Sequence, residues 1–286
     1  MRWIMGKHAL EEVLKHSPKR FIEVHTYKKD DALTHALKEK GIKVSFSPKH
    51  KLASIVSSES HQGFIAKVQE REFLTVKEFL RGCRHKIINK EEFPMSEVQC
   101  VRRKDPQSGL LKQNNDEISH RKDLRINNLE TTPSKTAPEK SLVLMCDAIQ
   151  DPQNFGSILR AAECFGVDAV IYSTNRNVAL TPVVSKASVG ASEIVPLIPV
   201  SNLVDTLKKF QDAGYFSVAT EISDKAEALD SFVFPEQTLL MIGAEGPGIQ
   251  PLLSKKSDFH LYIPMKGSID SLNVSQATAV LLSHWK

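Results

Sequence analysis

The sequence has little that would mark a disulfide-bonded, metal-binding or membrane protein. Its four cysteines are scattered along 286 residues, with no CxxC pair and no histidine at the spacing of a zinc ligand set. No apolar run is long enough to cross a bilayer, and the first residues lack the apolar core of a secretory signal. We therefore expect a reducing compartment, the cytoplasm by default although an organelle also fits, with no metal and no membrane partner.

The usual nucleotide-binding fingerprints are missing too. A glycine-rich loop, AEGPG at 244–248, follows an apolar run, but its last glycine is not followed by the Lys-Ser or Lys-Thr of a P-loop. The spacing does not match GxGxxG either, and this disfavours a nicotinamide-dependent enzyme on a doubly wound sheet.

Net charge is also small. The formal charge of +4 is compatible with a polyanionic partner, but it equally suits a slightly basic protein that binds nothing acidic. A hydrophobic content of 41% and a charged content of 25% are those of a globular protein, and the length allows one large or two ordinary domains.

Residues 1–75 alternate between helix-like and strand-like patterns, which predicts a small α/β domain. Basic residues in this region suit contact with phosphates, or form a plain solvated face; they are Lys7, Lys19, Arg20, Lys28 and Lys29. His8 and His61 stand beside glycines, and we interpret both as ordinary solvated or hydrogen-bonded side chains. The expected helices are 6–21, 31–41 and 49–56, and the expected strands are 21–27, 42–47 and 63–69.

Residues 76–140 are polar, rich in both charge signs and short of aromatic and β-branched residues. Such a composition cannot bury enough apolar surface to form a core, so we expect a flexible linker or insertion.

Residues 141–286 return to strand–helix alternation, which predicts a mostly parallel sheet covered by helices on both faces. A helix is expected to follow the turn at 151–154, with Asn154 as a candidate N-cap, and another to begin at Ser201.

The last quarter of the chain contains two apolar runs, each followed by a polar loop, which predicts a ligand cleft at the carboxyl edge of the sheet. Gly243, Gly246 and Gly248 would allow positive φ and the close approach of a ligand. Asn273 is a candidate N-cap, with Gln276 placed as in a capping box. Ser271 is then either a turn residue or a hydroxyl in the cleft.

Three stretches in this order carry a family resemblance: DPQNFGSILRAAECFG at 151–166, GAEGPG at 243–248, and IPM with SLNVSQATAVLL at 263–282. They resemble the motifs of the SpoU (TrmH-like) branch of the SPOUT RNA methyltransferases. The segments GKHALEEVL and HQGFIAKV resemble the substrate-binding domain of that branch, which is similar to ribosomal protein L30e. The resemblance implies a catalytic domain at 141–286 with a C-terminal trefoil knot, and a homodimer with sites shared between subunits. The polar segment 76–140 is longer than the connection in relatives.

The resemblance also implies S-adenosyl-L-methionine as cofactor and RNA as partner. Residues matching the catalytic positions are Arg160, Asn154, Glu245, Ser271 and Asn273. Residues matching the cofactor positions are Gly243, Glu245, Gly248, Ile263, Met265, Leu272 and Asn273. Arginine is a poor general base because its pKa exceeds about 12, so we expect Arg160 to stabilise the developing alkoxide and a nearby phosphate.

The resulting hypothesis is 2′-O-methylation of a ribose in structured RNA, with the two-domain layout closest to enzymes that modify a guanosine of large-subunit rRNA. The alternatives are a tRNA ribose 2′-O-methyltransferase and a catalytically idle RNA-binding factor of ribosome assembly. The joint presence of the five polar motif residues argues against idleness.

Overall fold

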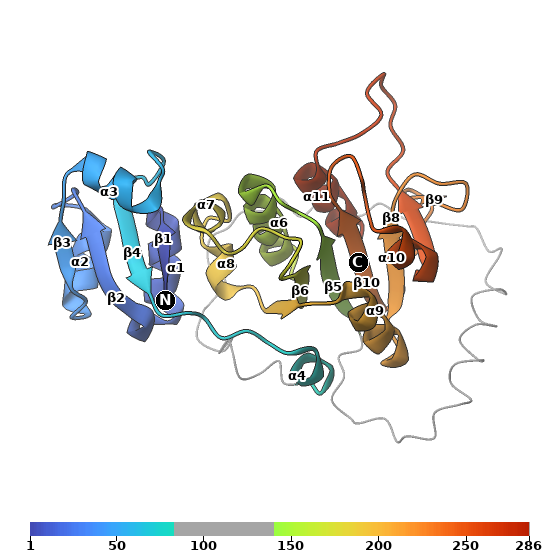
Figure 1. Ribbon diagram of the computed structural model, residues 1–286, viewed down its shortest axis with the longest axis horizontal. Coiled ribbons are helices and arrows are strands. Elements are labelled where there is room, and N and C mark those ends of the chain that lie inside the picture. Colours follow the sequence, from blue (N-terminus) through green and yellow to red (C-terminus); the bar gives the residue numbers. More distant parts are fainter. Residues whose placement is uncertain (83–139, 286) are drawn as a thin grey trace, which may run out of the picture. The chain divides into compact units, whose positions relative to one another are not determined.

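The computed structural model describes residues 1–82 and 140–285, which form two α/β domains (Figure 1). The N-terminal domain has a four-stranded sheet of order β1-β4-β2-β3, in which β4 is antiparallel to both neighbours and β2 is parallel to β3. The strands are β1 (Arg2–Met5), β2 (Phe21–Thr26), β3 (Val44–Phe46) and β4 (Phe64–Val68); the helices are α1 (Lys7–His16), η1 (Pro18–Arg20), α2 (Ala32–Glu39) and α3 (Lys49–Val56).

Helices cover both faces of this first sheet, because successive apolar side chains of β4 point to opposite faces. Phe64, Ala66 and Val68 belong to the cluster that includes α1 and α2 residues, whereas Ile65 packs with Leu52 of α3. The predicted α/β character is confirmed, and α3 has the expected bounds. Strand β1 was not predicted, because four residues are too few to show a periodicity.

The C-terminal domain contains one seven-stranded sheet of order β7-β6-β5-β10-β8-β11-β9, and every pairing in it is parallel. The strands are β5 (Ser141–Asp147), β6 (Ala169–Ser173), β7 (Leu197–Val200), β8 (Phe216–Thr220), β9 (Glu227–Ala228), β10 (Gln237–Gly243) and β11 (Phe259–Tyr262). The helices are α6 (Pro152–Cys164), α7 (Pro182–Ala187), α8 (Ala191–Ile194), α9 (Leu203–Asp212), α10 (Pro251–Lys256) and α11 (Val274–His284).

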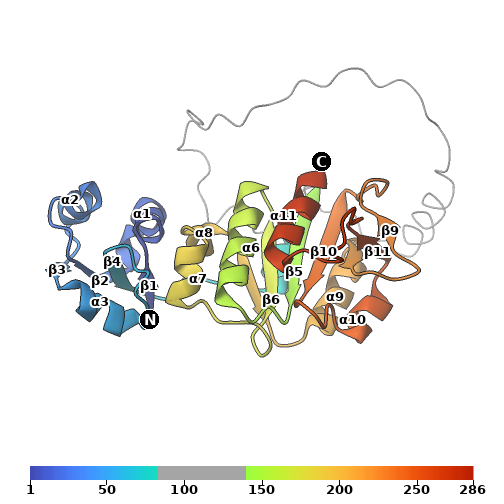
Figure 2. The same cartoon turned by 90° about the horizontal axis from the view of Figure 1, so that it is seen from above.

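Period-two alternation along β5 separates the two faces of this sheet. Leu142 and Leu144 pack in the cluster formed with α6 and α11, whereas Val143 and Met145 pack in the cluster formed with α9. Helices α6 and α11 lie side by side on one face (Figure 2). The predicted parallel sheet with two covered faces is confirmed, and the knot stays a prediction.

Two helix starts differ from the expectation. Helix α6 is capped by Asp151, whose side chain accepts hydrogen bonds from the N–H groups of Gln153 and Asn154, so Asn154 lies inside the first turn. Helix α9 is capped by Asn202, one residue after Ser201. In both cases two residues that commonly cap helices lie close together, and the cap is the one whose side chain reaches the free N–H groups of the first turn.

A short helix, α4 (Val76–Leu80), lies at the start of the segment predicted to be a linker. Its Phe79 is buried and stacks on Phe210 of α9, with ring centroids 5.7 Å apart, so these residues pack against the C-terminal domain. Residues 83–139 lie outside the described residues, and the division at 1–75, 76–140 and 141–286 stays a prediction.

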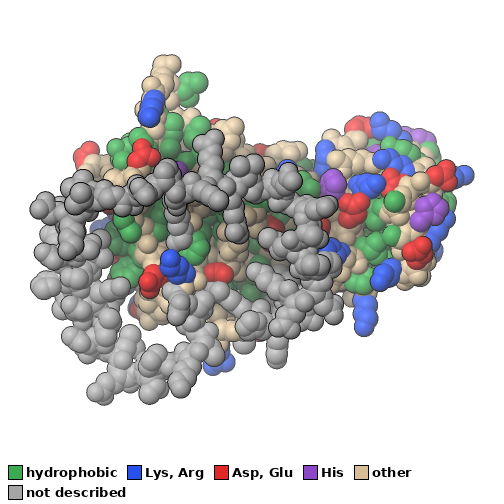
Figure 3. Space-filling model, turned by 180° about the vertical axis from the view of Figure 1, so that it is seen from behind, with side chains coloured by type: hydrophobic (Ala, Val, Ile, Leu, Met, Phe, Trp, Pro, Cys, Tyr) green, Lys and Arg blue, Asp and Glu red, His purple; other side chains and the backbone are tan. Residues whose placement is uncertain are grey.

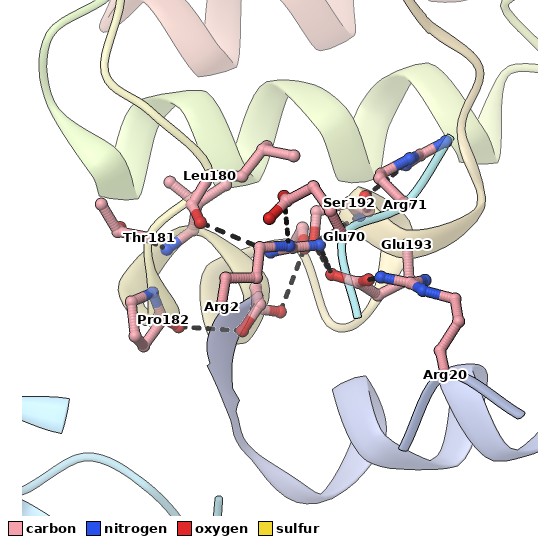
Figure 4. Close-up of polar contacts among 12 residues, drawn as sticks. Arg2, Arg20, Glu70, Arg71, Leu180, Thr181, Pro182, Ser192 and Glu193 are labelled. Carbon is pink, nitrogen blue, oxygen red and sulfur yellow. Dashed lines mark hydrogen bonds and ion pairs between the residues drawn. The ribbon is translucent and has the colours of Figure 1, made fainter. Parts of the chain in front are cut away.

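A buried carboxylate, Glu193 of α8, connects to the N-terminal domain (Figure 4). Its Oε1 accepts a hydrogen bond from Arg2 Nη2 at 2.5 Å, and its Oε2 accepts one from Arg20 Nη2 at 3.1 Å. Arg71 donates beside it to the carbonyls of Ser192 and Val195. Arg20 was considered for phosphate contact or a solvated face, and both interpretations are wrong because its guanidinium is bound here.

Three arginines surround the one buried carboxylate of this cluster. Burial alone would raise the pKa of Glu193, but the three surrounding arginines outweigh burial and hold that pKa below its ordinary value. Burial lowers the pKa of Arg71 to about 10, which leaves its guanidinium charged at neutral pH. The cluster therefore holds a paired, ionised carboxylate in a buried position.

Candidate active site

Three loops leave the same edge of the large sheet. Strands β5, β10 and β11 run in parallel, and the loops that follow them are 148–151, 244–250 and 263–273. The register places Gly243 opposite Asp147, at the carboxyl ends of β10 and β5. In open parallel sheets, ligands bind at this edge, so the fold brings the three predicted motifs to one region.

The glycine loop turns tightly back on itself. The N–H of Gly248 donates to the carbonyl of Ala244 at 2.9 Å, and these two residues form an isolated β-bridge. Gly246 and Gly248 have φ values of 88° and 67°, as predicted for positions that favour glycine. Gly243 does not have positive φ; a Cβ there would lie 2.1 Å from the carbonyl carbon of Gly248, so this glycine permits close packing of the loop on its strand.

A buried carboxylate fixes the exit of this loop. Asp147, at the end of β5, is fully buried, and its oxygens accept hydrogen bonds from Gln250 N at 2.8 Å and Gln250 Nε2 at 2.9 Å. Arg176 Nη1 lies 3.6 Å from the same carboxylate, at the solvent side. Sequence reasoning missed Asp147; the signal available was a carboxylate ending an otherwise apolar strand, LVLMCD.

Helix α6 carries two of the predicted catalytic residues. Asn154 is half-buried in the first turn, and Arg160 is exposed six residues further on, about 9 Å along the axis. Between them Gly156 allows α6 to approach α7, since a Cβ there would lie 2.5 Å from the Cβ of Ala187. The position of Arg160 is therefore set by α6, which packs closely against α7.

Helix α11 begins where predicted. Asn273 caps it, and its Oδ1 accepts from Ser275 N at 2.9 Å and Ser275 Oγ at 2.7 Å. The helix partner of the cap is thus Ser275, two residues on, rather than a box formed with Gln276. Ser271 and Leu272, just before the cap, are exposed at the carboxyl edge of the sheet.

The remaining predicted residues are spread around the same edge. Glu245 is exposed at the glycine loop, Ile263 and Met265 are half-buried after β11, and Ile263 packs against the core cluster that includes Leu281 of α11. Among the described residues, no ion pair joins Arg160 to Glu245. Within one chain, the structure therefore brings the motif loops to one edge but leaves these two opposite charges unpaired with each other.

The side chains favour some chemistries over others. Burial raises the pKa of the Cys146 thiol, the cysteine next to this edge, so it is a poor nucleophile. In the described parts of the chain, no group of His, Cys, Asp or Glu residues could hold a metal ion. Nor does any helix of those parts have the length and apolar character needed to cross a membrane.

The loops combine accessible backbone groups with apolar side chains, a mixture that suits a partly apolar ligand such as an adenosine group. Gly246 and Gly248 face open space, so backbone groups of the loop can approach a ligand. Ile263, Met265 and Leu272 supply apolar surface, and backbone amides and carbonyls would supply the polar contacts.

Comparison with known families then decides the identity of the fold. The model of the SpoU rRNA methylase family matches residues 141–283, and a model described as RNA 2′-O ribose methyltransferase substrate binding matches residues 3–74. The chain belongs to the SpoU rRNA methylase family. The predicted family membership is confirmed.

Individual SpoU relatives show how far the likeness extends. A 23S rRNA (guanosine-2′-O-)-methyltransferase from Coxiella burnetii is 30% identical over 98% of this chain and 92% of its own length. A TrmH family tRNA/rRNA methyltransferase from Staphylococcus epidermidis is 43% identical over 50% of this chain, and the match spans 57% of that relative's length. The SpoU methyltransferase AviRb from Streptomyces viridochromogenes, solved in complex with AdoMet, has a TM-score of 0.66 at 18% identity, covering 99% of this chain and 88% of that one.

Proposed function

We propose that this protein transfers a methyl group from S-adenosyl-L-methionine to a ribose 2′-hydroxyl of RNA, and that the target is a guanosine of large-subunit rRNA. The observation that carries the rRNA assignment is the match to the Coxiella burnetii enzyme, which runs through the substrate-binding domain as well as the catalytic domain. The half-length match to the tRNA/rRNA relative carries the methyltransferase class but does not separate the two RNAs.

The proposed cofactor site is the cleft edge formed by the three loops. The glycine loop at Gly243 and Gly248 presents backbone groups, while Ile263, Met265 and Leu272 present apolar surface. When bound there, S-adenosyl-L-methionine supplies an activated sulfonium methyl group. The loops hold it in place by main-chain contacts, so that most of the catalytic gain comes from alignment with the hydroxyl.

The chemical work of the protein's own side chains falls on Arg160. The new oxygen–carbon bond forms as the sulfur–carbon bond breaks, with its electron pair left on sulfur, and the hydroxyl proton is released to water. Negative charge develops on the 2′-oxygen as that proton leaves. An exposed guanidinium can stabilise this charge and bind an adjacent RNA phosphate at the same time. Asn154, Ser271 and Asn273 would orient the ribose and the loops around it.

We also propose that the active protein is a homodimer, in which Glu245 of one subunit pairs with Arg160 of the other. Two observations support this: both side chains are exposed in a single chain, and Phe165, just after the helix that carries Arg160, is 42% exposed. Exposed aromatic and charged side chains on one helix and its cap suit burial against a second copy.

The experiment is methyl transfer from radiolabelled S-adenosyl-L-methionine to RNA, followed by alkaline hydrolysis, with wild type, Arg160→Ala and Arg160→Lys. We expect label in alkali-resistant dinucleotides, a loss of about 10²- to 10³-fold in kcat for Arg160→Ala, and partial recovery in Arg160→Lys. Cofactor affinity, measured by calorimetry, should change little in either variant. Label that appears only in alkali-sensitive mononucleotides would contradict ribose methylation.

A further inference from the structure

The N-terminal domain carries a recess of about 400 Å³ that none of the motifs above includes. Strands β1 and β2 run in the same direction, because both are antiparallel to β4, so the segments after β1 and β2 meet the segment before β4 at one edge of the sheet. The residues that line the recess come from these three segments: Lys7, His8, Tyr27, Lys28 and Gln62.

An exposed aromatic ring forms one wall of the recess. Tyr27 is 41% exposed, and its ring lies edge-on to the buried ring of His61, with centroids 6.2 Å apart and an interplanar angle of 78°. His61 is itself held, because its Nδ1 accepts a hydrogen bond from Gly63 N at 3.0 Å. Tyr27 is thus supported from the core side while a part of its surface is open to a ligand.

Two lysines are held beside this ring. The stem of Lys28 lies along the backbone of Gly63, where a Cβ would come within 2.8 Å of Lys28 Cε, and its ammonium lies 5.7 Å from the ring centroid of Phe64. Lys7 Nζ is fixed by Asp31, 2.9 Å from Oδ1. The Lys28 ammonium is therefore placed by neighbouring residues, so less conformational freedom is lost when it binds an anion, whereas the Lys7 ammonium is already paired with the Asp31 carboxylate.

The polar groups at the mouth of the recess are mainly donors. Gly6 begins helix α1 without a side-chain cap, and the N–H of Lys7 donates to Gln62 Oε1 at 3.2 Å, so the remaining polar group of the Gln62 amide is a donor. On the face seen in Figure 3, this domain carries Lys, Arg and His side chains among acidic ones. An aromatic wall with fixed cations and an amide donor is the chemistry that recognises an unstacked nucleotide.

We propose that this recess holds one nucleotide of single-stranded RNA, with the base against Tyr27 and the phosphate beside Lys28. The proposal rests on the proposed function, since it names where the substrate-binding domain grips its RNA. A base paired within a duplex cannot offer its face to Tyr27, so a splayed or looped nucleotide is required.

The test measures binding of a fluorescein-labelled single-stranded RNA oligonucleotide by anisotropy, using the full chain without cofactor. A duplex of the same sequence is measured in parallel. Tyr27→Ala should weaken binding to the single strand by about 5- to 150-fold, the range of one lost base stack, and Tyr27→Phe should retain it. Affinity for the duplex should be lower and unaffected by either change.

The phosphate contact of Lys28 is tested by the salt dependence of binding to the same single-stranded oligonucleotide. For a single strand, each lost phosphate contact reduces the slope of log K against log[salt] by about 0.7, which we expect for Lys28→Ala and not for Tyr27→Ala. Lys43→Ala is the matched control, because Lys43 is exposed just before β3 and so lies at the opposite edge of the same sheet.

The outcomes separate the two proposals. If wild type binds RNA but Tyr27→Ala stays within twofold of it, or Lys28→Ala behaves as Lys43→Ala does, the recess is not the site while the proposed function stands. Equal affinity for the duplex overturns the single-strand assignment. If wild type binds neither RNA, the proposed function fails and the recess assignment fails with it.

Discussion

The buried carboxylate of Asp147 offers the sharpest test of how the glycine loop is held. It accepts two hydrogen bonds from Gln250, at 2.8 and 2.9 Å, and this residue ends the AEGPG loop. In Asp147→Asn the side chain keeps its shape, and the Gln250 amide can rotate to present its oxygen to the new donor. Geometry is therefore preserved while the charge is removed.

The expected magnitude follows from the two bonds. Hydrogen bonds to a charged group contribute about 1.5–3 kcal/mol, and neutral ones about 0.5–1.5 kcal/mol, so two such replacements cost about 2 kcal/mol of the free energy of unfolding. Where this loss of stability falls on the glycine loop, the affinity for S-adenosyl-L-methionine decreases on the order of tenfold, because about 1.4 kcal/mol corresponds to that factor.

The assay combines urea unfolding with calorimetric titration of S-adenosyl-L-methionine. Arg176→Ala is the control, because Arg176 contacts the same carboxylate at 3.6 Å from a side chain that is 45% exposed, where ion pairs contribute about 0–1 kcal/mol. An Asp147→Asn protein that loses stability but binds S-adenosyl-L-methionine as wild type does would refute the assignment of Asp147 to loop positioning.

Three further predictions concern close packing and the charge cluster. Gly243→Ala should abolish cofactor binding in calorimetry, because its Cβ would overlap the Gly248 backbone. Gly246→Ala, where space is open but φ is 88°, should lower the free energy of unfolding by only about 1–2 kcal/mol, and equal effects of the two variants on cofactor binding would contradict the packing argument. Glu193→Gln should lower the free energy of unfolding by about 3 kcal/mol in urea, since it leaves buried arginines uncompensated, and a change below 1 kcal/mol would show that the cluster is not paired as described. Because the pKa of Glu193 is lowered, its full contribution to the free energy of unfolding is present above the ordinary pKa of about 4.5 and is lost as the pH falls below that value. The difference in the free energy of unfolding between wild type and Glu193→Gln should therefore shrink in acid, and a difference independent of pH would contradict this.

Much of the fold could be predicted from local pattern. The apolar run at β5 with its period-two division of faces, the bounds of α3 and the cap at Asn273 all depend on residues adjacent in sequence. The start of α6 could not be predicted, because Asp151 and Asn154 can both cap a helix and only the backbone geometry distinguishes them.

The features that could not be predicted depend on distant partners. Asp147 gains its role only when Gln250, about a hundred positions away, folds next to it. Gly156 looks like a weak point of a helix until α7 is seen against it, and Glu193 looks like a surface carboxylate until Arg2 and Arg20 reach it. No periodicity or spacing reports such long-range contacts.

The measurement that tests the central claim most directly is methyl transfer to two unmodified RNAs, a large-subunit rRNA transcript and a tRNA mixture, offered separately with labelled S-adenosyl-L-methionine. The account predicts alkali-resistant label at a guanosine of the rRNA, formed about 10²- to 10³-fold more slowly by Arg160→Ala. Label confined to the tRNA would contradict the rRNA assignment, and a protein that binds the cofactor and RNA but labels neither would contradict the proposed enzymatic activity.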